Sequence, residues 1–127
     1  MKNDVLISIS ALLVHAARID ENYTVKEQEI IKKFITSFSK QTESIDNVLQ
    51  QAEVLEANSI QLLGFTNKAK EQSLDIKKKI IGHLWKIIIS DENVDYYESN
   101  LMRRICGLIY FPDKLCGEIK LKVLQNN

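Results

Sequence analysis

Four carboxylates occupy matching positions in two stretches of the sequence. Glu27 follows Asp20 at the same spacing at which Glu98 follows Asp91. Carboxylate oxygens are the ligands that hard divalent cations such as Ca²⁺, Mg²⁺ and Mn²⁺ prefer. The four residues are therefore candidate metal ligands, and a divalent cation is the one cofactor that the sequence suggests. Acidic residues also cap helices, so a purely structural role is the alternative.

The two stretches are copies of one pattern. Residues 13–34 align without a gap on residues 84–105, and Leu, Asp, Glu, Asn and a later Glu are identical in both. Each copy has an apolar segment with helical spacing, an Asp-Glu-Asn turn and an amphipathic segment. The sequence therefore predicts a duplicated, pseudo-symmetric helical hairpin with its acids at the turns. It leaves open whether the two turns face each other.

The structural alternative follows from the positions of the glutamates. Thr24 precedes Glu27 by three residues, which is the pattern of a capping box at a helix start. Asp95 stands in the same relation to Glu98. In such a box each side chain accepts a backbone N–H group of the other residue, so every carboxylate would already have a role in the fold.

The second turn resembles a calcium-binding loop only at its start. Asp91, Asn93 and Asp95 alternate as in an EF-hand, but Tyr96 occupies the sixth position and Met102 the twelfth. An EF-hand requires Gly at the sixth position and Glu at the twelfth. Any cation site would therefore be weak and would use both turns.

Helical periodicity extends over the whole chain and predicts an all-α fold. Apolar residues make up 45% of the 127 residues, enough for one continuous core, and only four Gly and one Pro interrupt the pattern. The expected helices span about residues 4–19, 24–36, 44–57, 60–71, 73–90, 96–110 and 113–124. The helix at 73–90 is apolar nearly all round toward its end, which predicts a central position. We expect a single domain, residues 1–127.

Composition argues against several classes of partner. Seventeen basic and seventeen acidic side chains balance, so no overall field attracts nucleic acid or an anionic membrane. Charged residues interrupt every apolar run, which argues against membrane insertion. The two cysteines, Cys106 and Cys116, are too few for a disulfide framework and favour a reducing cytoplasm. Cys106 takes the apolar position of Ile35 in the repeat, and we expect both thiols to be buried and inert.

The usual catalytic patterns are missing from the sequence. It contains no glycine-rich phosphate loop and no G-x-S-x-G elbow, and His15 and His83 have no ligand at metal-binding spacing. We therefore expect a protein that is not an enzyme. Tyr96 and Tyr97 directly follow the second acidic turn, and one of them is a candidate contact for a protein partner.

The duplicated turns resemble those of the TerB-like family, small helical domains from tellurite-resistance gene clusters. The family pattern is an apolar helix ending in Ala-Asp-Gly, followed by a Glu in the next helix, present twice. Here Asp20 with Glu27 and Asp91 with Glu98 match it over nearly the whole chain. Gly is replaced by Asn in both copies, and Ala by Ile19 or Ser90. The resemblance implies a seven-helix cytoplasmic bundle whose acidic clusters bind divalent cations or partner proteins in stress responses.

Three functions are compatible with these observations. The first is an interaction or sensing module that docks a protein partner through the acidic turns. The second is a divalent-cation-binding protein that uses the paired turns. The third is a metal-assisted hydrolase, which would need a water-activating site between the turns.

Overall fold

A computed structural model describes residues 1–19, 22–39, 44–59, 62–90 and 96–126, with the side chains of 96–99 left out. Within these ranges the chain forms seven α-helices and no strand, which confirms the predicted all-α fold. The helices are α1 (Asn3–Ala17), α2 (Val25–Phe38), α3 (Ile45–Ala57), α4 (Leu63–Lys70), α5 (Leu74–Ser90), α6 (Tyr96–Leu108) and α7 (Asp113–Gln125).

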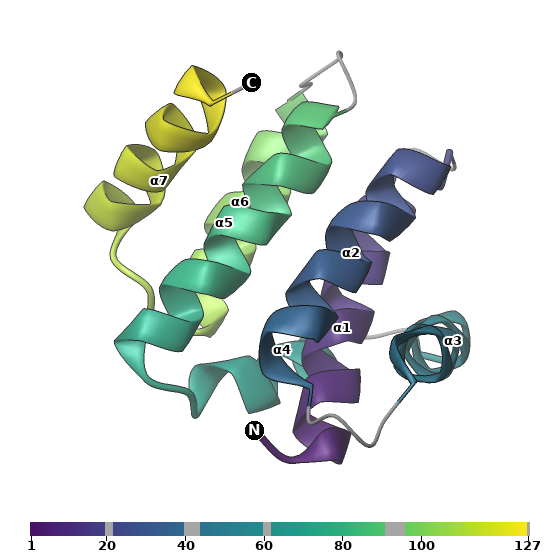
Figure 1. The fold of residues 1–127 in the computed structure, drawn as a ribbon. Helices are drawn as coiled ribbons and strands as arrows, with labels where there is room; N and C mark the ends of the chain where they lie inside the picture. Colours follow the sequence, from purple (N-terminus) through teal and green to yellow (C-terminus); the bar gives the residue numbers. More distant parts are fainter. Residues whose placement is uncertain (20–21, 40–43, 60–61, 91–95, 127) are drawn as a thin grey trace.

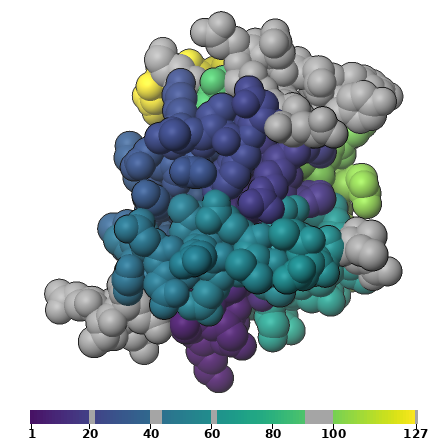
Figure 2. Space-filling model, turned by 90° about the vertical axis from the view of Figure 1, so that its right-hand side faces the viewer, coloured from purple at the N-terminus to yellow at the C-terminus, as the bar shows by residue number. Residues whose placement is uncertain are grey.

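The helices of the two hairpins form the middle of the bundle. Figure 1 shows α1, α2, α5 and α6 running roughly alongside one another, with α7 packed against α5 on one side. On the other side α3 packs against α1 and α2 and crosses them steeply, so that it is seen end-on. Figure 2 looks onto this second side, where α2 lies above the band that contains α3. The helices outside the hairpins therefore cover both flanks.

The centre of the core is shared by α1 and α5. The sequence predicted α5 as the centre, and its residues Ile80, Leu84 and Ile87 are indeed buried. However, α1 is the more completely buried helix, with nine of its 15 residues inside. Small residues on α1, such as Ala11 and Ala16, let α2, α3, α4 and α5 all approach it closely.

Equivalent positions of the two copies face the same core. Leu13 and Leu84 are both 0% exposed, and Phe34 and Ile105 are both 0% exposed. The two hairpins thus use one pattern of buried positions to contribute to a single hydrophobic cluster.

Two helix ends differ from the sequence prediction for local reasons. The second helix ends at Phe38, which the sequence placed in its apolar stripe, although a polar connection was predicted to begin at Ser37. The ring of Phe38 packs at 5.0 Å from the ring of Phe34, and this contact favours another helical turn. The first helix ends at Ala17, two residues early, and the side chain of the following Arg18 pairs with Glu56 of α3.

Candidate functional site

The structure describes one of the four predicted site side chains. Asp20 and Asp91 lie outside the described residues, and Glu98 belongs to α6 but its side chain is among those left out. Glu27 is fully described, in the first turn of α2. Whether all four carboxylates come together therefore stays a prediction, and so does the exposed contact expected of Tyr96 or Tyr97.

Glu27 forms the capping box that the sequence predicted. The backbone N–H of Thr24 donates to Oε1 of Glu27 at 2.8 Å, and the N–H of Glu27 donates to Oγ1 of Thr24 at 3.1 Å. The carboxylate lies at the positive end of the α2 dipole and is only 3% exposed. Glu27 thus has a structural role, whatever else it binds.

The carboxylate of the first hairpin also lies next to the second hairpin. Glu27 and Thr24 line a small cavity of about 160 Å³ together with Lys26 and Ser90. Ser90 is the last residue of α5 and directly precedes Asp91 in the chain. Because α2 begins where α5 ends, Ser90, the residue before the second acidic turn, lies close to Glu27, the capping glutamate of the first hairpin. We call this region the hairpin end of the bundle.

Lysines from three helices stand at the hairpin end. Lys26 of α2, Lys86 of α5 and Lys122 of α7 line a second cavity of about 390 Å³. This cavity shares Lys26 and Ser90 with the small cavity beside Glu27. All three lysines are exposed, so their ammonium groups remain hydrated at its rim. The capping carboxylate of Glu27 therefore lies close to positive charge.

A polar cluster fixes the end of α1 to α3. Nη1 of Arg18 donates to Oε1 of Glu56 at 2.7 Å, and Nδ1 of His15 lies 3.6 Å from the other carboxylate oxygen. The Arg18 guanidinium also stands 5.2 Å from the centre of the Tyr23 ring. Burial raises the pKa of Tyr23, and the nearby Glu53 carboxylate raises it further. This cluster was not predicted from the sequence, although basic residues lie at the end of α1 and acidic residues at the end of α3.

The described residues do not by themselves form a metal centre. Among them, no three His, Cys, Asp or Glu side chains lie close enough together to hold an ion. The side chains of Asp20, Asp91 and Glu98 are not among the described residues, so the cation site stays a prediction. None of the described helices combines the length and the continuous apolar sequence needed to cross a membrane.

The fold and the hairpin end together define a class of small helical domains built on two hairpins with acidic turns. The chain belongs to the family of the tellurite resistance protein TerB, whose family model matches residues 6–121. The match includes both hairpins, which confirms the resemblance seen in the turns. No curated protein and no solved structure matches the chain.

Proposed function

We propose that this chain is an interaction module of a cytoplasmic stress response, without catalytic activity of its own. In this proposal a protein partner docks at the hairpin end through the two acidic turns. The observation that supports the proposal is the cavity that Glu27 and Ser90 both line. Glu27 belongs to the first hairpin, and Ser90 directly precedes the acidic turn of the second. Membership of the TerB family is consistent with a stress-related role and names no substrate for this chain.

The charges at the hairpin end favour docking over ion capture. One oxygen of Glu27 already accepts the N–H of Thr24, which reduces what the carboxylate can offer a metal ion. The lysines at positions 26, 86 and 122 would repel a cation, whereas a partner protein can pair with charges of both signs. A mixed rim of this kind selects a partner by charge complementarity, and a basic segment opposite the turns is the expected match.

Neutralising the two turns tests the docking proposal. Asp20→Asn combined with Asp91→Asn removes two charges and keeps side chains that cap turns and helix ends nearly as well. We expect the amount of a specific partner captured from cells to fall about tenfold, because complementary charges govern association and specificity. The matched control is Asp75→Asn with Glu118→Gln, which removes two charges from exposed positions of α5 and α7. Capture is quantified by mass spectrometry.

Only a protein that the turn variant loses and the control retains supports docking at the hairpin end. If both double variants capture the same proteins in the same amounts, the acidic turns do not bind a partner and the proposal is wrong. Adding a chelator to wild-type capture shows whether a divalent cation bridges the two proteins.

The alternative function is divalent-cation binding by Asp20, Glu27, Asp91 and Glu98. The observation that favours it is the buried carboxylate of Glu27 beside the residue that precedes Asp91. Calorimetric titration with Ca²⁺, Mg²⁺ and Mn²⁺ tests this function on wild type and on Asp91→Ala. It predicts heat of binding from wild type that the variant loses. Absence of heat from wild type at millimolar metal would rule it out, together with any metal-assisted hydrolysis at this site.

A further inference from the structure

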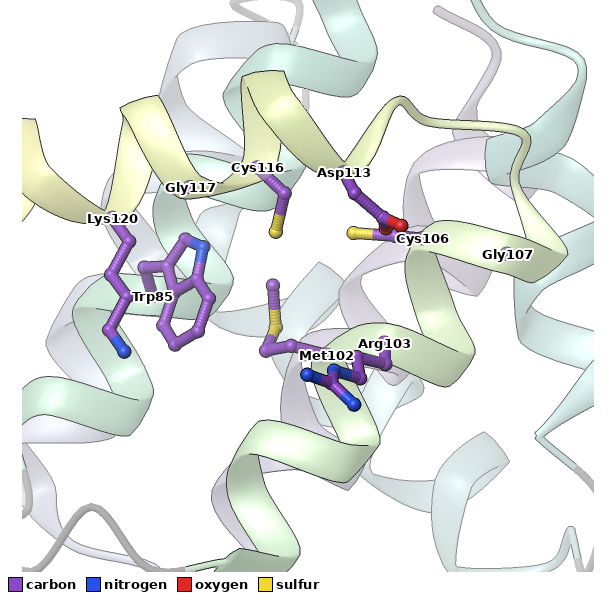
Figure 3. Close-up of a pocket in the computed structure, with 9 residues that line it drawn as sticks. All are labelled: Trp85, Met102, Arg103, Cys106, Gly107, Asp113, Cys116, Gly117 and Lys120. Atoms are coloured by element: carbon purple, nitrogen blue, oxygen red, sulfur yellow. The ribbon is translucent and has the colours of Figure 1, made fainter.

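A second group of reactive side chains lies where α6 ends and α7 begins, away from the hairpin end (Figure 1). Cys106 of α6 and Cys116 of α7 are both free thiols, 1% and 8% exposed. Figure 3 shows their sulfur atoms pointing into the same cavity. The sequence predicted that both thiols would be buried, which the structure confirms, but gave no sign that they would meet.

The chain reversal after α6 brings the two cysteines together. Tyr110 has a left-handed backbone with φ of 58°, and the N–H of Phe111 donates to the carbonyl of Cys106 at 2.8 Å. The N–H of Tyr110 donates to the carbonyl of Gly107 at 3.4 Å, which completes the two hydrogen bonds of a Schellman motif. This motif folds the chain back so that the first turns of α7 lie over the last turns of α6. The meeting of the thiols is therefore built into the fold.

The cavity between the helices has an apolar floor and a charged rim. It measures about 600 Å³, and its lining includes the buried side chains of Met102 and Trp85 together with the charged side chains of Arg103, Asp113 and Lys120 (Figure 3). Trp85 is 5% exposed, and its indole nitrogen has no hydrogen-bond partner within bonding distance. A buried N–H without a partner is rare and indicates a place for a polar ligand atom. The cavity can therefore admit a small polar reagent to the thiols.

The surroundings of the two cysteines shift their thiol pKa values in opposite directions. The neighbouring Cys106 thiol lowers the pKa of Cys116 to about 7, and the Lys120 ammonium acts in the same direction against burial and Asp113. The same contact and burial raise the pKa of Cys106. The assignment agrees with position, because Cys116 is the cysteine beside the indole N–H in Figure 3. Cys116 is thus the nucleophile and Cys106 the neutral thiol that supports it.

We propose that Cys106 and Cys116 form a thiol oxidation site that reacts with hydroperoxides. The Cys116 thiolate attacks the terminal oxygen of the hydroperoxide, so that an S–O bond forms and the O–O bond breaks. The sulfur is oxidised to a sulfenic acid, and the peroxide is reduced to an alkoxide that takes a proton from solvent and leaves as an alcohol or water. Cys106, losing its proton, then attacks that sulfur, and hydroxide leaves with the proton as water. The resulting disulfide joins α6 to α7.

The charged rim suits this reaction. Arg103 and Lys120 line the cavity and stabilise the oxygen anion that leaves when the O–O bond breaks. The Lys120 ammonium lies 5.0 Å from the centre of the Trp85 ring, which keeps it at the cavity edge. Because its pKa is lowered, a larger fraction of Cys116 than of an ordinary cysteine is ionised at pH 7. We therefore expect Cys116 to react about tenfold faster than an unperturbed thiol.

The test uses the reduced full chain treated with hydrogen peroxide. In wild type, intact mass should fall by two hydrogen atoms and maleimide labelling of both thiols should be lost, with recovery on adding dithiothreitol. Cys106→Ser should stop at the sulfenic acid of Cys116, which dimedone traps. In Cys116→Ser the thiol of Cys106 should be consumed at least about tenfold more slowly. Trp85 is the only tryptophan, so its fluorescence reports the disulfide directly.

Two outcomes would overturn the proposal. One is that folded wild type keeps both thiols at a peroxide concentration that oxidises the urea-unfolded chain. The other is that the two serine variants lose their remaining thiol at the same rate, which would mean that the cavity activates neither cysteine. Circular dichroism shows whether each variant is folded, and the wild-type comparison holds even if one of them is not.

Discussion

We expect Leu84→Ala to lower the free energy of unfolding by about 3 kcal/mol, and Leu13→Ala to lower it by a similar amount. Both leucines are 0% exposed, and they occupy the same position in the two copies of the hairpin. Removing either side chain loses the burial of its methyl groups and leaves a cavity between helices that cannot close around it. The measurement is urea unfolding followed by circular dichroism.

Leu121→Ala is the matched control for these two core substitutions. Leu121 lies on α7 and is 59% exposed, so its truncation should change stability by no more than about 0.5 kcal/mol. If Leu13→Ala or Leu84→Ala were as mild as the control, that leucine would not belong to the shared core. A large difference between the two would show that the hairpins contribute unequally to the fold.

We expect Glu27→Ala to lower the free energy of unfolding by about 2 kcal/mol. The substitution leaves the backbone N–H of Thr24 without its acceptor and removes a buried charge from the positive end of α2. Glu27→Gln keeps an acceptor oxygen and should cost about half as much. Because Thr24 and Glu27 cap each other, the effects of Thr24→Ala and Glu27→Ala should not add, and a double-mutant cycle measures the coupling.

Glu29→Ala provides the control in the same helix. Its side chain is 58% exposed and pairs with Lys32 at 3.7 Å, so its loss should cost no more than about 0.5 kcal/mol. If Glu27→Ala were as stable as wild type, or more stable, the carboxylate would not be serving the fold. That result would favour the cation-binding alternative, in which a buried carboxylate is kept for its ligand.

The helices could be predicted because their signals are local. The apolar residues of α1, α2 and α5 recur at helical spacing. The capping box is visible in the sequence because Glu27 follows Thr24 by three residues. Repetition added a second kind of evidence, because Leu13 and Leu84 share a position and both prove to be buried. The family assignment was predictable from the same repeat, and the family model matches residues 6–121.

The parts that could not be predicted depend on how helices pack. The reversal at Tyr110 uses a left-handed residue that is not Gly, so no glycine marks it in the sequence. Without that turn, nothing in the spacing of Cys106 and Cys116 shows that they meet. The lysines at 26, 86 and 122 come from three helices and gather only in the folded bundle. Likewise Ser90 reaches Glu27 only because α2 begins where α5 ends.

The central claim, that a partner docks at the hairpin end, is tested most directly by crosslinking in intact cells. A photoreactive amino acid replaces Asn22, which is exposed beside the first acidic turn, and in a separate strain Glu71, which is exposed just before α5 begins at the other end. We predict that the probe at position 22 yields a covalent adduct with a partner protein and that the probe at position 71 does not. Adducts from position 71 alone, or equally from both positions, would contradict docking at the hairpin end.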